Sequence, residues 1–199
     1  MSSARLSADA RREQIIEVAI DVFGRSGYFG ASMNDIAEAA GVTKPVLYQH
    51  FDSKGDLYSA LLDTVGHRML DAIAKATSDA SNGKEQTMRG FQAYFRWVAQ
   101  SHDEFMLLFG SSARHSGEFI EQLRQITDQA AEAIAPLIAV DVDRERRRTL
   151  AHAIVGLAEG ASRRLVGIGA QFDPDEVAEE VGTLAWAGLR AVGPTDEPT

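Results

Sequence analysis

The chain has 199 residues, of which 45% are hydrophobic and 25% charged, so it can form a packed core in one or two domains. The formal net charge of −9 argues against general affinity for phosphate backbones. The absence of cysteine excludes disulfides and thiolate metal sites. Because no apolar signal segment or run of membrane-spanning length occurs, we expect a cytoplasmic protein with no membrane partner.

The first predicted helix covers about residues 8–25. Apolar side chains recur on one face of it at helical spacing, namely Ile15, Ala19, Val22 and Phe23. Three closely spaced glycines then predict a flexible loop to the next helix: Gly24, Gly27 and Gly30.

Residues 32–54, SMNDIAEAAGVTKPVLYQHFDSK, predict two short helices separated by a turn. Ser32 can cap the first helix, and Asp35 three residues later can close a capping box. The apolar face of this helix consists of Ile36, Ala37 and Ala40. Gly41 supplies a turn conformation that a Cβ atom would penalise.

The second short helix has the layout of a DNA-reading helix. Thr43 can cap it, and Pro45 falls in its first turn, where a missing N–H does little harm. Leu47 and Phe51, four residues apart, point into the core. The side chains left for the opposite face and the helix start are Lys44, Pro45, Tyr48 and Gln49. This arrangement can place a helix N-terminus and a few polar groups in the DNA major groove.

The stretch resembles the TetR (tetracycline-repressor-like) family of bacterial regulators. The matching segments are Asp35-Ile36-Ala37, Ala40-Gly41-Val42-Thr43-Lys44, Leu47-Tyr48-Gln49-His50-Phe51 and Ser53-Lys54. The helix before them, residues 10–23, also fits, so the resemblance covers roughly residues 9 to 60. It implies a DNA-reading domain of three helices, and a double-stranded DNA operator as partner.

The resemblance also implies roles for the matching residues. Lys44, Pro45 and Gln49 would face base edges. Phosphates would be held by Thr43, Tyr48, His50 and Lys54, with Ser32 completing the predicted DNA-binding set. Residues 1–56 carry six Lys or Arg against eight Asp or Glu. We therefore expect tight binding to a specific site, and weak, strongly salt-sensitive binding elsewhere.

The rest of the chain is predicted to be helical as well. A helix beginning near Ser53 should connect a DNA-binding domain (1–53) to a ligand-binding and dimerisation domain (54–199), and residues 78–84 should form a loop. Further helices are expected at roughly 85–100, 102–110, 117–139, 142–169 and 174–192, and a disordered tail at 193–199. The last helix begins well, with Asp173 as cap and Pro174 in its first position. Since no segment alternates with period two, the expected fold is all-α, with about nine helices.

Large apolar side chains are concentrated between residues 91 and 109, and two interpretations of them stay open. They are either plain core or the lining of an apolar ligand site. The predicted ligand-binding set is Phe91, Phe95, His102, Met106, Phe109, Phe119 and Leu123. Polar groups that could orient a ligand there are Arg96, His102 and Glu159.

The last two predicted helices have a broad apolar face. The predicted interface residues are Leu150, Ile154, Leu157, Ala161, Val181, Leu184 and Leu189. Close helix approach would be allowed by Gly156, Gly160 and Gly182. Packing within the chain could explain this face, whereas the family resemblance implies a four-helix interface between two copies.

No catalytic or metal motif occurs. None of the five histidines has an acidic residue three positions before it, and no serine or threonine lies in a nucleophile motif. We therefore expect no enzyme, no metal and no cofactor. The expected function is a homodimeric regulator, specifically a repressor released from a palindromic operator by an apolar small molecule. The alternatives are a helical small-molecule-binding protein or enzyme with a vestigial helix-turn-helix, and a regulator or activator without such a ligand.

Overall fold

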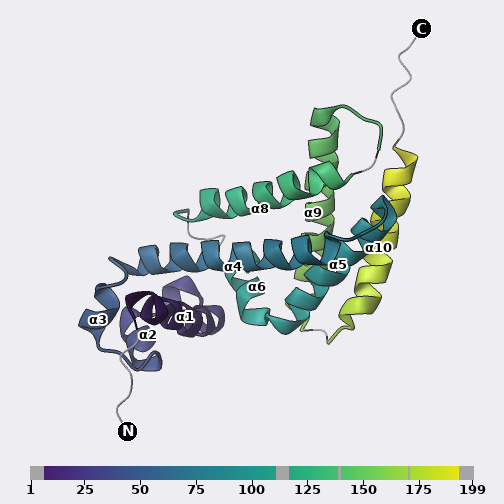
Figure 1. The fold of residues 1–199 in the computed structure, drawn as a ribbon. Helices are drawn as coiled ribbons and strands as arrows, with labels where there is room; N and C mark the ends of the chain where they lie inside the picture. Colours follow the sequence, from purple (N-terminus) through teal and green to yellow (C-terminus); the bar gives the residue numbers. More distant parts are fainter. Residues whose placement is uncertain (1–6, 111–116, 139, 170, 193–199) are drawn as a thin grey trace. The chain divides into compact units, whose positions relative to one another are not determined.

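The computed structural model describes residues 7–110, 117–138, 140–169 and 171–192 (Figure 1). Over these ranges the chain forms nine α-helices, one 3-10 turn and no strand, which confirms the predicted all-α fold. The helices are α1 (Ala8–Gly30), α2 (Met33–Ala39), α3 (Lys44–Tyr48), α4 (Lys54–Thr77), α5 (Gly83–Gln100), α6 (His102–Phe109), α8 (Ile120–Ile134), α9 (Arg144–Gly167) and α10 (Pro174–Ala191), with η1 (Ala135–Leu137) after α8. The tail expected at 193–199 lies outside the described residues.

The described residues belong to two compact units. Unit 1 comprises residues up to Val65 together with 102–122, and unit 2 comprises 66–101 together with the residues from Leu123 onward. Helix α4 therefore contributes its first half to one unit and its second half to the other. The functional boundary expected at residue 54 stays a prediction.

Unit 1 is built on the apolar face of α1, which packs against α2 and α6. Its buried side chains are Ile15, Ile16, Ala19, Ile20 and Phe23. The loop predicted from Gly24 onward is wrong, because α1 continues to Gly30 with a single non-helical residue, Gly27, at φ 67°. A Cβ atom on Gly24 would lie 2.4 Å from the Cβ of Asp103 on α6. Gly24 is therefore a site of close helix packing.

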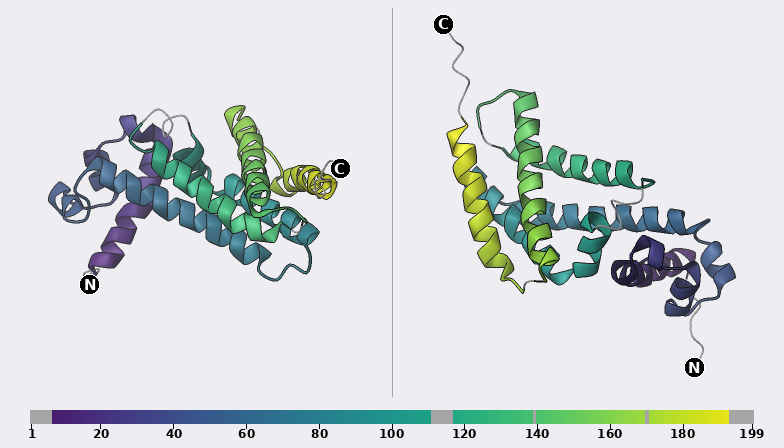
Figure 2. Two further views of the ribbon diagram at one scale, coloured as in Figure 1. Left: turned by 90° about the horizontal axis from the view of Figure 1, so that it is seen from above. Right: turned by 180° about the vertical axis from the view of Figure 1, so that it is seen from behind.

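Unit 2 is a helical assembly in which α10 packs along α5 (Figure 2). Gly182 on α10 is buried, and a Cβ atom there would lie 2.9 Å from the Sδ of Met88 on α5. The close approach predicted at Gly182 is thus confirmed within the chain. Gly156 and Gly160 on α9 have no atom within 4 Å of an added Cβ. Among the described residues these two glycines make no close helix contact, so the approach of a partner helix to them stays a prediction.

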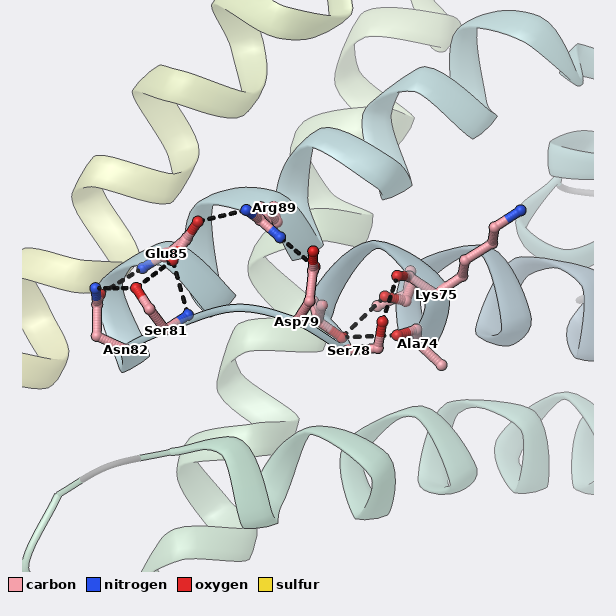
Figure 3. A network of polar contacts seen from close by, with 10 residues as sticks. Ala74, Lys75, Ser78, Asp79, Ser81, Asn82, Glu85 and Arg89 are labelled. Atoms are coloured by element: carbon pink, nitrogen blue, oxygen red, sulfur yellow. Dashed lines mark hydrogen bonds and ion pairs between the residues drawn. The ribbon is translucent and has the colours of Figure 1, made fainter.

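The connection between α4 and α5 is a hydrogen-bonded turn within the predicted loop (Figure 3). Asn82 caps α5 by accepting from the Glu85 amide at 2.9 Å. The Glu85 carboxylate accepts from the amide of Ser81 at 2.8 Å and from its hydroxyl at 2.6 Å. These bonds to Ser81 lower the pKa of Glu85. Arg89 pairs with Glu85 and with Asp79, so one guanidinium ties the turn to the helix that follows.

The predicted start of α10 is confirmed. Asp173 accepts hydrogen bonds from the amides of Asp175 at 2.8 Å and Glu176 at 3.4 Å, and Pro174 is the first helical residue. Among the residues whose structure is described, no helix has both the length and the apolar character needed to span a membrane.

Candidate functional site

Helix α2 and the turn after it have the predicted geometry. The Ser32 hydroxyl accepts from the Asp35 amide at 3.2 Å, and the Asp35 carboxylate accepts from the Ser32 amide at 3.0 Å. Gly41 has φ 64°, the left-handed conformation that glycine adopts without strain. Ser32 also donates its hydroxyl to Asp35 at 2.7 Å, so this side chain already serves the cap of its own helix.

Helix α3 buries one face and exposes the other. Leu47 is fully buried and Phe51 is 1% exposed, as predicted. Tyr48 is 43% exposed on the other face, and His50 is half-buried. Thr43, Lys44, Pro45 and Gln49 are exposed. Thr43 is at the N-cap position, but its side chain makes no cap hydrogen bond, so the predicted capping role of its hydroxyl is wrong.

Two arginines of α1 support this helix pair from within unit 1. The Arg12 guanidinium lies 4.8 Å from the centre of the Phe51 ring. Arg11 donates to the Gln14 side chain at 2.7 Å, and Gln14 donates to the carbonyl of Ala40 at 3.3 Å. The contacts from Arg12 to Phe51 and from Gln14 to Ala40 could not be predicted from local spacing, since each spans more than 25 residues of the chain.

Lys54 directs its ammonium group into unit 1. The Nζ atom donates to the carbonyls of Tyr28 at 2.9 Å and Ala31 at 3.1 Å, and it lies 4.5 Å from the centre of the Tyr28 ring. These contacts join the start of α4 to the end of α1. They compete with the phosphate contact that the family resemblance implies for Lys54.

An aromatic cluster lies beside the contact between the start of α4 and the end of α1. The Phe119 ring is 5.0 Å from that of Tyr28 and 4.7 Å from that of Tyr58. Burial and then the neighbouring carboxylate of Glu118 raise the pKa of Tyr28. Gln122 donates to the backbone carbonyl of Ser59 at 2.9 Å and to Asp63 at 2.7 Å. Residues 117–122 are therefore fastened to the first half of α4.

The residues of the predicted ligand set are divided between the two units. Phe91, Phe95 and Leu123 belong to unit 2, whereas His102, Met106, Phe109 and Phe119 belong to unit 1. Phe91 and Phe95 are buried with ring centres 6.2 Å apart. His102 is exposed, and Phe109 is buried.

The three polar groups suggested as ligand partners differ in burial. Arg96 forms a surface pair with Asp175 at 2.7 and 2.9 Å, and His102 is exposed. Glu159 is 8% exposed and accepts from Arg163 at 2.9 Å. Burial therefore singles out Glu159 among them.

The predicted dimer residues lie on α9 and α10 in unit 2. Leu184 is 62% exposed, and the half-buried members are Leu150, Ile154, Leu157, Ala161 and Val181. Leu189 is 6% exposed and lies in the core cluster that includes Ala151 and Val155. The structure thus places Leu189 inside the chain's own core, and leaves Leu184 as the most exposed member of the predicted interface set.

Known proteins match over both parts of the chain. A family model described as bacterial regulatory proteins of the tetR family matches residues 15–61, and a tetracycline-repressor-like C-terminal domain matches residues 84–188. The HTH-type transcriptional activator FasR of Mycolicibacterium smegmatis is 30% identical over 190 residues, which cover 94% of this chain and 87% of that protein. The regulator TtgR of Pseudomonas putida is 30% identical over 132 residues, covering 64% of this chain and 60% of TtgR.

Solved structures share the fold. A TetR-like transcriptional regulator from Rhodococcus sp. RHA1 superimposes with a TM-score of 0.77 and 28% identity, covering 94% of this chain and all of that one. FadR from Bacillus subtilis, solved in complex with stearoyl-CoA, superimposes with a TM-score of 0.79 and 19% identity, covering 88% and 98%.

Proposed function

The chain belongs to the TetR family of bacterial transcriptional regulators, and from that premise we propose that it is a homodimeric repressor released from a palindromic operator by an apolar small molecule. The DNA-binding part of this proposal is supported by α3, which has one buried face and one exposed face. Leu47 and Phe51 hold this helix against unit 1, while Lys44 and Tyr48 remain exposed.

A two-fold dimer supplies two copies of α3 and therefore reads two inverted half-sites. Lys44, Pro45 and Gln49 contact base edges in this proposal, and Thr43, Tyr48 and His50 contact phosphates. The free hydroxyl of Thr43 supports its phosphate role, because the helix does not use it as a cap.

The dimer proposal rests on α9 and α10. Leu184 exposes 62% of its surface, and Gly156 and Gly160 leave room for another helix beside α9. Small residues allow helix axes to approach closely, and an exposed apolar side chain gains free energy when a partner covers it.

The ligand proposal rests on the buried aromatic side chains. Phe91 and Phe95, which are buried in unit 2, provide apolar surroundings in which the apolar area of a ligand contributes about 25 cal/mol per Å² on burial. For release, the ligand must bind the DNA-free conformation more tightly than the DNA-bound one. Stearoyl-CoA is a suitable first probe, since a protein of the same fold was solved with it.

Selection of bound duplexes from a random DNA pool tests the whole proposal. The expected result is a palindromic consensus, bound by two chains and released by an apolar compound. Binding of DNA without any palindrome contradicts the dimeric reader. If no sequence is selected, the alternative holds, in which the helix-turn-helix is vestigial and the protein binds small molecules.

Activation is the second candidate function, because FasR, which matches almost the entire chain, is named a transcriptional activator. In vitro transcription from a promoter containing the selected site decides between the two. Repression requires transcript to fall when the protein is added, whereas activation requires it to rise. If the protein binds its site but no apolar compound releases it, the ligand part of the proposal is wrong and the DNA-binding part stands.

A further inference from the structure

A group of buried and half-buried polar side chains lies among α5, α8 and α9, inside unit 2. Glu159 and Ser162 are three residues apart on α9 and so share one face of that helix. Thr127 on α8 donates to one oxygen of the Glu159 carboxylate at 3.4 Å, and Arg163 donates to the other at 2.9 Å. The charges of Glu159 and Arg163 both act on the pKa of Tyr94 on α5, so the Tyr94 hydroxyl belongs to the same group.

Two hydroxyls in this group are buried without a completed hydrogen bond. Ser162 is fully buried and Tyr94 is 6% exposed, and in the part of the chain that the structure describes neither side-chain oxygen has a partner at hydrogen-bond distance and angle. A long hydrogen-bonding contact from the Ser162 hydroxyl lowers the pKa of the Tyr94 phenol, so the two oxygens are neighbours, but no bond of normal distance and angle joins them. Buried polar atoms in folded proteins almost always have partners. Two neighbouring exceptions on two helices indicate a place for an external polar atom.

We infer that Tyr94 and Ser162 donate hydrogen bonds to a neutral oxygen, such as an ester, ketone or alcohol oxygen, of an otherwise apolar ligand. This inference rests on the ligand response proposed above and names the chemistry that the site selects. Both hydroxyls can donate at once, because each has one O–H and neither has an acceptor at normal hydrogen-bond distance and angle among the described residues.

The surroundings explain why a neutral oxygen is preferred over an anion. Tyr94 and Ser162 are buried, and the negative charge that acts on the Tyr94 hydroxyl is that of Glu159, which is 8% exposed. Burial is the main cause that raises the pKa of Tyr94, and the charge of Glu159 raises it further. The positive charge of Arg163 acts in the opposite direction, but Arg163 is already paired with Glu159 at 2.9 Å. A ligand carboxylate would therefore meet the same two penalties with little compensation. Apolar contacts for the rest of the ligand come from Phe95, whose ring centre is 5.4 Å from that of Tyr94.

Two matched compound series test the inference, one built on a decyl chain and one on a naphthyl ring, each as methyl ester, primary alcohol and carboxylate. Trp97 is the reporter, because its ring lies 6.1 Å from that of Tyr94, and Trp186→Phe removes the second tryptophan of the chain. In at least one series the ester and alcohol should bind about tenfold more tightly than the carboxylate.

Tyr94→Phe and Ser162→Ala should each weaken ester binding about fivefold to tenfold, the effect of one hydrogen bond. Neither should lower the melting temperature of the ligand-free protein, since neither hydroxyl holds a protein partner. Glu159→Gln should reduce the disadvantage of the carboxylate. Thr87→Val is the matched control, because it removes a hydroxyl of α5 that donates to the Gly83 carbonyl at 2.8 Å; it should keep the wild-type preference.

Unchanged affinities in Tyr94→Phe and Ser162→Ala overturn the inference and leave a buried water as the partner of both hydroxyls. A lower melting temperature in both variants also overturns it, because the hydroxyls then bond to each other for stability. Equal binding of all six compounds, with release of DNA, refutes the inference and keeps the proposed ligand response. Absence of binding by every member of both series refutes the inference, while operator binding, measured separately, decides the DNA-reading proposal.

Discussion

At the scale of single residues, the exposed face of α3 gives the first prediction. Lys44→Ala and Tyr48→Ala should each weaken operator binding by about 1–3 kcal/mol, as a lost base or phosphate contact does. Both side chains are exposed, so the free energy of unfolding should change by less than about 0.5 kcal/mol. Gel-shift titration and thermal melting of the same variants measure the two effects. Lys75→Ala, at an exposed lysine late in α4, is the control and should bind DNA normally.

Lys54 gives the second prediction, which differs from the phosphate role that the family resemblance implies. Lys54→Ala removes two hydrogen bonds from an ammonium group to the Tyr28 and Ala31 carbonyls, and it should lower the free energy of unfolding by about 1–3 kcal/mol. The slope of log K against log salt concentration should stay at its wild-type value. A slope reduced by about one unit per lost contact, with unchanged stability, would instead assign Lys54 to a phosphate.

Tyr58 gives a prediction about pH. Burial raises the pKa of Tyr58 from its ordinary value of 10.0 to about 12. The neutral phenol is favoured in the fold, so its stabilising contribution is complete below pH 10 and is lost as the pH rises toward 12. This loss amounts to roughly 2–3 kcal/mol, at about 1.4 kcal/mol per unit. Denaturant unfolding between pH 9 and 12 should show a smaller decline in Tyr58→Phe than in wild type; parallel declines would contradict the assignment.

The residues that sequence reasoning placed correctly are those whose role depends on near neighbours in the chain. The Ser32 and Asp35 capping box, the left-handed Gly41 and the buried Leu47 all follow from spacings of a few residues. Lys54 could not be placed in this way, because its acceptors lie 23 and 26 residues earlier. The same holds for Tyr94, whose neighbours on α9 are visible only in three dimensions.

At the scale of elements, the crossing of α1 and α6 provides a prediction. In Gly24→Ala the new methyl group would lie 2.4 Å from the Cβ and 2.9 Å from the backbone Cα of Asp103. The two helices would have to separate, at a cost of roughly 1–3 kcal/mol. Thermal melting should show this loss in Gly24→Ala and not in Gly167→Ala, whose added methyl meets no atom within 4 Å. Equal melting temperatures for the two variants would show that this crossing is less tight than the structure has it.

Helix boundaries were predictable where capping residues mark them. Asp173 and Pro174 fixed the start of α10, and Asp143 in the cap of α9 lies next to its predicted start. Glycine was a less reliable guide, because its meaning depends on the neighbouring element. Gly24 and Gly27 both resembled loop residues, yet the first is a helix contact and the second a single left-handed kink.

At the scale of the whole molecule, the oligomeric state gives the last prediction. Light scattering of the wild type should give twice the chain mass of 21.6 kDa, and Leu184→Glu should give the single-chain mass. Leu184 is exposed in the chain, so this change should spare the fold while burying an unpaired charge at the interface. Ile120→Glu, at a side chain 53% exposed at the start of α8, is the matched control and should remain dimeric. A wild-type mass equal to that of one chain refutes the dimer.

Unit 1 is assembled from two separate segments of the chain, and this affects how hybrid regulators can be built by gene fusion. Its polypeptide comes from two stretches of the gene, one ending at Val65 and one spanning 102–122. A single splice that grafts residues 1–53 onto another effector domain would remove Asp103 from Gly24 and Phe119 from Tyr28. A graft with three junctions, which transplants residues 102–122 together with the reader, keeps both contacts within one parental sequence. Hybrids of the second kind should therefore be recovered as soluble, operator-binding protein more often than those of the first.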